Sequence, residues 1–275
     1  MSKTEAQEHL QAGRLQEALS ALRQAVRKSP ADASLRIFLF ELLSLVGEWE
    51  KALTQLQVVG ELDPDSFLLA QAFRPAVQCE VLRGEVFSGK RTPLIFGEPE
   101  PWVSWLVQAN HLIATGKAEA SAELRERAFA EAPASAGSIN GQSFEWIADG
   151  DSRLGPMLEV ILEGKYYWIP FARMVSIRIG SPETLRDLIW IPAQFTWSNG
   201  GNATGLIPVR YAGTESSSDD ALRLSRKTDW LKRSDELFIG VGQRMLATDH
   251  TEYPLLEARQ IGFESPPQTV SAEMM

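Results

Sequence analysis

Acidic side chains in the second half of the sequence are the residues best suited to chemistry. They are Glu145, Asp149, Asp151, Asp187, Asp219, Asp220, Asp229, Asp249 and Glu252. If two or three of these carboxylates converged, they would offer the hard oxygen ligands that magnesium or calcium prefers, and the cation could assist a hydrolysis. Asp149-Gly150-Asp151 superficially suggests a calcium loop, but it lacks the spaced acidic ligands and terminal glutamate of that motif. Turn carboxylates that accept hydrogen bonds from their own backbone are the preferred interpretation, and a metal-assisted hydrolase is the alternative.

Arginines accompany these acids along the same half of the chain. They are Arg153, Arg186, Arg210, Arg244 and Arg259, and most of them stand close to aromatic or acidic residues in the sequence. The forked guanidinium group can make buried ion pairs with carboxylates, which would be architecture. The same groups could instead form an anion pocket.

Other motifs for catalysis or cofactor binding are missing from the sequence. There is no serine-centred nucleophile elbow, no phosphate loop and no dinucleotide fingerprint, and Gly240-Val241-Gly242 lacks the third glycine. Cys79 is the only cysteine, which excludes an intramolecular disulfide and a thiolate metal cluster, and the three histidines lie far apart. The sequence therefore predicts no catalytic residues, no metal site and no cofactor.

Length and charge narrow the class of protein. A chain of 275 residues with 44% hydrophobic residues favours two globular domains. The net charge of -9 argues against nucleic acid and favours basic or neutral protein surfaces as partners. No apolar run approaches the roughly 20 residues that span a bilayer, and Lys3, Glu5 and Glu8 stand where a signal peptide would be apolar. We expect a cytoplasmic protein without membrane insertion.

The elements that must position these residues begin with a helical repeat. Three times a glycine is followed seventeen residues later by a proline, at Gly13 and Pro30, Gly47 and Pro64, and Gly116 and Pro133. The first two pairs are thirty-four residues apart, the period of tetratricopeptide helix-turn-helix arrays. We expect such an array over residues 1–134. It is irregular, because 67–86 predicts a helix interrupted near Pro75 and 89–101 predicts an extended loop.

A stacked array leaves its first helices on a concave surface that can accept a peptide. In the predicted register this peptide-binding groove is lined by Ile37, Glu41, Ser44, Leu106 and Asn110. The alternative is that the apolar members of this set simply pack against neighbouring helices.

After Pro133 the helical period gives way to short β-favouring runs. Candidate strands are 166–171, 174–179, 188–197, 206–211 and 237–241, and short helices are expected at 157–163, 183–187 and 221–230. Regular β-α-β alternation is missing, so residues 135–275 predict an α+β domain with a mainly antiparallel or mixed sheet. The whole chain thus predicts a multi-domain protein of α and β parts.

Specific motifs, densest in this second half, resemble a known family along nearly the whole chain. The stretch NGQSFEWIADGDSRLGP at 140–156, continuing to GKYYWIP at 164–170, resembles the ImpE family, also called TagJ. Further matches in the family's order are FGEP at 96–99, Trp102, LRDLIW at 185–190, IPVRY at 207–211, TDW at 228–230, GQR at 242–244 and YPLL at 253–256.

The resemblance implies an accessory protein of bacterial type VI secretion systems without assigned catalytic residues. It also implies a partner, the N-terminal helix of the small sheath subunit TssB, and through it an effect on how the ATPase ClpV recycles contracted sheath. The aromatic residues Trp146, Tyr166, Tyr167, Trp168 and Trp190 are either an apolar trough for such a partner or core. We place the expected helix site in the helical half or at the junction of the domains.

Overall fold

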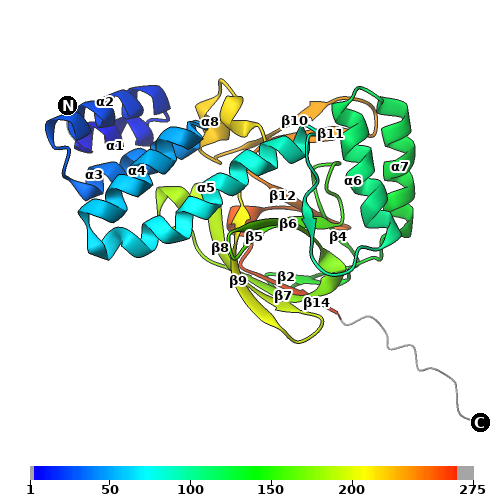
Figure 1. Ribbon diagram of the computed structural model, residues 1–275. Coiled ribbons are helices and arrows are strands. Elements are labelled where there is room, and N and C mark those ends of the chain that lie inside the picture. The colour runs from blue at the N-terminus through cyan, green and yellow to red at the C-terminus, as the bar shows by residue number, and fades with distance from the viewer. Residues whose placement is uncertain (1–2, 265–275) are drawn as a thin grey trace, which may run out of the picture.

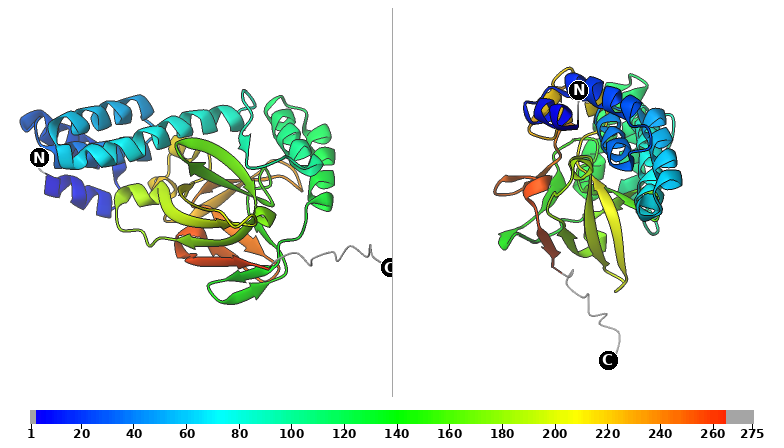
Figure 2. Two further views of the ribbon diagram at one scale, coloured as in Figure 1. Left: turned by 60° about the horizontal axis from the view of Figure 1, so that its bottom comes forward. Right: turned by 90° about the vertical axis from the view of Figure 1, so that its left-hand side faces the viewer.

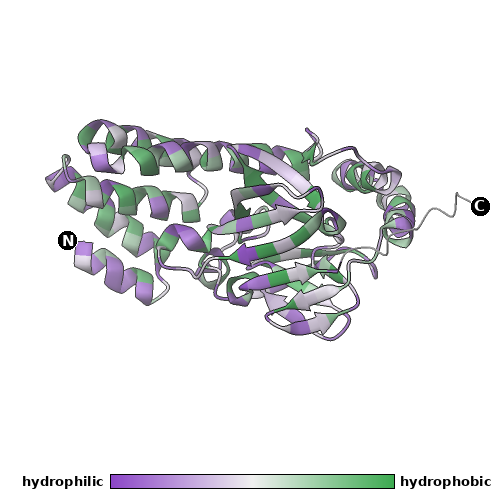
Figure 3. Cartoon of the chain, turned by 90° about the horizontal axis from the view of Figure 1, so that it is seen from below, coloured by the Kyte–Doolittle hydropathy of each residue, from purple (hydrophilic) through white to green (hydrophobic). Residues whose placement is uncertain are grey.

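Helices form the first part of the computed structural model, which describes residues 3–264. They are α1 (Lys3–Gln11), α2 (Leu15–Lys28), α3 (Ala33–Leu45), α4 (Trp49–Leu62), α5 (Phe67–Phe87), α6 (Pro101–Ala114) and α7 (Ala118–Glu131). Helices α1 to α4 form one end of the molecule, and α6 and α7 form a hairpin at the other (Figure 1). The long helix α5 runs between the two ends along the sheet. Polar and apolar residues alternate along these helices, as expected when one face is buried (Figure 3).

The glycine signature has a direct structural cause. Gly13, Gly47 and Gly116 have φ angles of 74°, 74° and 77°, and each makes the turn between two antiparallel helices. Residues with a Cβ atom rarely adopt this left-handed conformation. Asp32 then starts the next repeat by capping α3, because its carboxylate accepts two backbone N–H groups. The predicted tetratricopeptide-like array is confirmed.

Helix α5 differs from the prediction, because it continues through Pro75 without interruption. A contact with the sheet explains why the helix remains continuous at Pro75. The turn between strands β5 (Met157–Leu162) and β6 (Lys165–Pro170) lies against it, and a Cβ atom built on Gly164 of that turn would come within 2.8 Å of Pro75. Packing on the sheet therefore holds a helix that propensity alone would break.

A nine-stranded mixed sheet dominates the rest of the chain. Its order is β1-β6-β5-β9-β8-β7-β14-β2-β3. The strands are β1 (Leu94–Ile95), β2 (Gly137–Ile139), β3 (Gln142–Phe144), β5 (Met157–Leu162), β6 (Lys165–Pro170), β7 (Met174–Ile179), β8 (Trp190–Trp197), β9 (Asn202–Pro208) and β14 (Gln260–Phe263). Only the β1–β6 pair of this sheet is parallel. The prediction of a mainly antiparallel or mixed sheet is confirmed.

Two small sheets and short helical turns complete this part (Figure 2). Strands β4 (Ile147–Asp149), β12 (Met245–Thr248) and β13 (Glu252–Pro254) form one small sheet, and β10 (Thr228–Lys232) and β11 (Phe238–Gly242) form the other. The turns include η3 (Leu185–Leu188) and α8 (Asp220–Arg223). Two predicted helices are wrong: 157–163 is the buried strand β5, and 221–230 is divided between α8 and β10.

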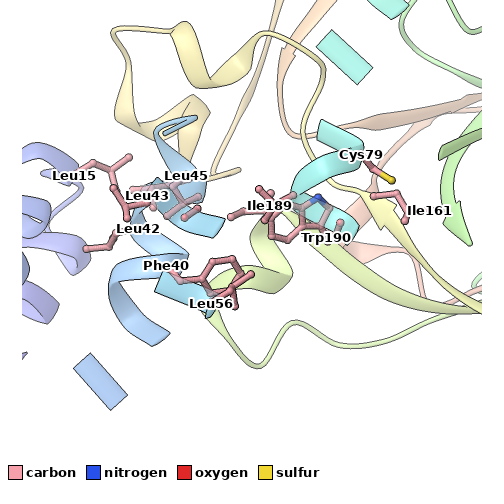
Figure 4. Close-up of a cluster of buried hydrophobic side chains, with 14 of the residues drawn as sticks. Leu15, Phe40, Leu42, Leu43, Leu45, Leu56, Cys79, Ile161, Ile189 and Trp190 are labelled. Atoms are coloured by element: carbon pink, nitrogen blue, oxygen red, sulfur yellow. The ribbon is translucent and has the colours of Figure 1, made fainter. Parts of the chain in front are cut away.

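The hydrophobic core crosses the predicted boundary between residues 134 and 135. One continuous cluster joins the array to the sheet, and Figure 4 shows Phe40 and Leu56 of the helices near Ile189 and Trp190 of the sheet part. Strand β1, from the first predicted domain, also pairs with β6. The division into 1–134 and 135–275 remains a prediction about folding units. Among the described residues, no helix is both long and apolar enough to cross a membrane.

Candidate functional site

Two of the predicted residues, Arg244 and Asp149, belong to a buried charge cluster between α5 and the sheet whose central members were not predicted. Glu159 of β5 lies at its centre, and Arg83 of α5 donates to both of its oxygens at 2.6 and 2.8 Å. Arg244 and the Tyr166 hydroxyl donate to the same carboxylate. Burial opposes ionisation of Glu159, but Arg83 and Arg244 outweigh it and lower its pKa to about 2. The cluster therefore holds a permanent buried negative charge between two guanidinium groups.

Three carboxylates of the hydrolase hypothesis, those of Asp149, Asp151 and Asp249, are already engaged. Asp149 pairs with Arg244, and burial raises the pKa of Asp149 to about 6 despite this pair. Asp151 pairs with Arg153 at 2.6 Å, and Asp249 accepts the backbone N–H of Glu145 at 2.9 Å. Within residues 3–264, no group of three or more His, Cys, Asp or Glu side chains could hold a metal ion. The described residues therefore lack the carboxylate cluster that a metal-assisted hydrolase would need.

The other predicted arginines tie the sheet part to the array or to its own turns. Arg210 donates to the carbonyl oxygens of Ser44 and Leu45 at the end of α3, at 3.2 and 2.8 Å. Arg186 of η3 pairs with Glu41 of α3 at 2.7 Å. Arg259 donates to two backbone carbonyl oxygens in its own loop. Each of these guanidinium groups is thus bonded to a carboxylate or to backbone carbonyl oxygens of the described chain.

The predicted peptide-binding groove is covered by the protein itself at α3. The Trp190 ring contacts the rings of Phe40, Trp49 and Phe73, with centroids 6.4, 6.4 and 5.9 Å away. The structure leaves Ile37 half-buried and buries the other four predicted residues, which are Glu41, Ser44, Leu106 and Asn110. Glu41 faces Arg186, and the Ser44 hydroxyl donates to the Phe40 carbonyl. An external helix has no access to Glu41 or Ser44 in this arrangement.

An open groove of about 450 Å³ lies elsewhere on the array, between α4 and α5. We call it the α4–α5 groove; its lining residues are Leu56, Gln57, Gly60, Glu61, Phe67, Ala70, Gln71, Arg74 and Pro75. Phe67 is 47% exposed, and Leu68 beside it is 76% exposed. The sequence does not predict this groove, because the expected binding surface uses the first helix of each repeat and the 67–86 helix was predicted to be interrupted near Pro75.

The predicted aromatic trough is mostly core. Tyr166, Trp168 and Trp190 are fully buried, and Tyr167 is half-buried. Trp146 alone of this set is exposed, and with Phe129 it lines a hollow of about 480 Å³ between α7 and β4. The sheet part therefore offers one aromatic surface patch from the predicted set.

Asn110 has a different environment from the other predicted groove residues. It lines a pocket of about 710 Å³ between the end of α5, the loop 89–93 and α6. We call this the α5–α6 pocket. Its cationic residues Lys90 and Arg91 belong to a loop that the sequence pattern marked only as extended.

Comparisons with known proteins agree along almost the whole chain. The family model described as ImpE protein matches residues 141–262, and the model described as Tetratricopeptide repeat matches residues 9–74. The crystal structure of protein VPA1032 from Vibrio parahaemolyticus is similar with a TM-score of 0.88 and 29% identity, over 95% of this chain and 98% of that one. The type VI secretion system accessory component TagJ of Pseudomonas aeruginosa is 48% identical over 259 residues, which are 94% of this chain and 91% of TagJ. Identity at this level along both chains shows a common family, and the protein belongs to the ImpE family.

Proposed function

We propose that this protein is a non-catalytic adaptor of a bacterial type VI secretion system that works in the cytoplasm. Its proposed ligand is the N-terminal helix of the small sheath subunit TssB. Two findings support the adaptor role: the relationship to TagJ, which is named an accessory component, and the tetratricopeptide-like array, a kind of fold that commonly binds proteins. The engaged carboxylates give no support to the hydrolase alternative.

The α4–α5 groove is the observation that carries this proposal. Gly60 of α4 and Ala70 of α5 have small side chains at the floor, and a Cβ atom on Gly60 would lie 3.5 Å from that of Ala70. Phe67 and Arg74 stand two turns apart along the α5 wall, roughly 10 Å. An amphipathic helix can lay an apolar stripe of about two turns into such a groove.

Exposed apolar side chains beside the groove add a reason for a partner. Leu62, Phe67 and Leu68 cluster where α4 ends and α5 begins. Full burial of one such side chain contributes roughly 1.5–3 kcal/mol, and 1.4 kcal/mol is a tenfold change in affinity. A charge at Leu68 should therefore weaken helix binding by at least about tenfold.

A titration tests the proposal. A synthetic peptide of the TssB N-terminal helix is titrated into the full chain by isothermal calorimetry, and we expect saturable binding that weakens in Leu68→Glu. Leu231→Glu is the matched control, because Leu231 is 44% exposed on β10. No binding at high micromolar peptide would contradict the adaptor role. Binding that survives Leu68→Glu but is lost in Trp146→Glu would move the ligand to the α7–β4 hollow.

We further propose that binding of the TssB helix by this protein modulates the ClpV-dependent recycling of contracted sheath. A TssB helix that is bound to this protein is inaccessible to other proteins. The surface of the sheath that ClpV can contact therefore changes. ClpV-driven disassembly of purified contracted sheath should change in rate when wild-type protein is added. The same rate with wild type and with Leu68→Glu would contradict this step.

A further inference from the structure

The α5–α6 pocket has the properties of a second binding site. We propose that it binds an extended, acidic peptide segment, independently of the helix expected in the α4–α5 groove. The lining residues are Val86, Gly89, Lys90, Arg91, Thr92, Pro93, Ser104, Val107, Gln108, Asn110, His111 and Trp168. The ligand class follows from one unpartnered amide, the charge of the rim and the shape of the floor.

Asn110 is the strongest sign that this pocket takes a ligand. Its side chain is only 4% exposed, and neither its Nδ2 nor its Oδ1 has a hydrogen-bond partner among the described residues. Buried polar atoms are normally paired, because an unpaired one forfeits its bonds to water. A peptide group offers one donor and one acceptor, which matches both atoms of the amide, whereas phosphate ions and carboxylates offer mainly acceptors. The unpartnered pair thus favours a peptide main chain over a small anion.

Charge at the pocket selects acidic side chains. The cationic residues Lys90 and Arg91 line it, and no aspartate or glutamate does, although the whole protein has a net charge of -9. Arg91 already pairs with Glu85 at 2.9 Å on the surface, while Lys90 makes no ion pair within residues 3–264. A ligand carboxylate could therefore pair with the ammonium group of Lys90, which has no other ion-pair partner among the described residues. It could also pair with Arg91, whose charge Glu85 partly neutralises.

The wall formed by loop 89–93 is fixed before any ligand arrives. Gly89 has a φ angle of 71°, and a Cβ atom there would come within 2.7 Å of the Ala114 side chain, so the loop approaches α6 closely. His111 Nδ1 donates to the Gly89 carbonyl at 2.9 Å. Just beyond the loop, β1 pairs with β6. Preorganised walls lower the entropic cost of binding.

The floor of the pocket is apolar, with Val86, Val107 and the fully buried Trp168. In an extended peptide, successive side chains point to opposite sides. One set can then place small apolar groups on this floor while the other presents carboxylates to the rim. We expect ligands in which acidic residues alternate with small apolar ones.

Selection from a display library tests this specificity without knowledge of the natural partner. Random peptides of about six residues, which span roughly 20 Å when extended, are selected on the full chain. Enrichment of acidic sequences is the expected result. An absence of enrichment, or enrichment of basic sequences only, would overturn the proposal.

Variants then locate the site, with fluorescence anisotropy of the best selected peptide as readout. K90E/R91E and N110L should each weaken binding at least tenfold. Lys117→Glu, a single charge reversal in the α6–α7 turn outside the pocket, should leave it unchanged. N110L removes an unpaired buried amide, so its Tm should equal or exceed that of wild type. Unchanged affinity in both pocket variants, a Tm loss in N110L, or full displacement of the peptide by millimolar phosphate would contradict a peptide site here.

Discussion

Two faces of the same helical array differ in what covers them. At α3, Trp190 packs on Phe40 and Arg186 pairs with Glu41, so the sheet of the same chain occupies that face. Between α4 and α5, Phe67 and Leu68 remain exposed beside an open groove. Both faces involve helices within residues 9–74, the stretch that the tetratricopeptide model matches. Repeats therefore predict helices, whereas the availability of a face for a partner depends on what the rest of the chain covers.

The largest expected effect on stability is at the covered side of the array, where the buried charge cluster joins α5 to the sheet. Glu159→Gln leaves Arg83 and Arg244 buried around a neutral side chain. Removing one partner of a buried ion pair typically costs about 3–5 kcal/mol, and we expect a loss of that size in the free energy of unfolding from urea titrations. Glu119→Gln on the exposed surface of α7 is the control. A loss below about 1 kcal/mol would mean that the cluster does not hold the sheet on the array.

The pH dependence of the same variant sharpens this prediction. The pKa of Glu159 is about 2 in the folded protein against an ordinary value of 4.5. The stabilisation by this carboxylate is therefore complete above pH 4.5 and is lost as the pH falls toward 2. The difference in unfolding free energy between wild type and Glu159→Gln should shrink by up to roughly 3 kcal/mol over that interval. A gap that stays constant or widens on acidification would contradict this account.

Arg186→Ala probes the contact that closes the α3 face. Glu41 would lose its partner in a mostly buried position, and Phe73 would lose the guanidinium group 5.3 Å from its ring centroid. We expect a loss of roughly 1–3 kcal/mol in the free energy of unfolding, because a buried polar group left unpaired costs about that much. Affinity for the TssB helix should be unchanged. A stable Arg186→Ala protein with altered helix affinity would assign the ligand to α3.

The smallest effect on stability is expected beside the open α4–α5 groove. Leu68→Glu changes a side chain that is 76% exposed, so the free energy of unfolding should stay within about 0.5 kcal/mol of wild type. Urea titration checks this value. A large loss would mean that Leu68 supports the fold, and its effect on helix binding would then be indirect.

The array could be predicted from the sequence because its signals are local. Gly13, Gly47 and Asp32 each determine a turn or a cap within a few residues. Strand β5 was predicted as a helix because all six of its residues are buried, which removes the alternation that marks a half-buried strand. The pairing of Arg83 with Glu159 across 76 residues has no local signal at all.

At the candidate site, too, contacts between distant segments could not be predicted from local sequence. Asn110 was predicted to line a binding surface, and it does line a pocket, although the concave face expected around it is buried. Glu41 was predicted in the same register, and it is covered by Arg186 from a distant segment. Helical periodicity gives the direction of a side chain, and only the packing of the sheet decides whether solvent reaches it. Prediction of the α4–α5 groove would have required both the helical periodicity and the packing of the sheet.

Photo-crosslinking of the TssB helix tests the central claim most directly. A photoreactive amino acid is placed at position 68 beside the open groove, or at position 37 on α3, in otherwise unchanged full-length protein. We predict a crosslink to the helix from position 68 and none from position 37. Crosslinking from position 37 alone would contradict it, because the helix would then bind at the face that the protein's own sheet occupies.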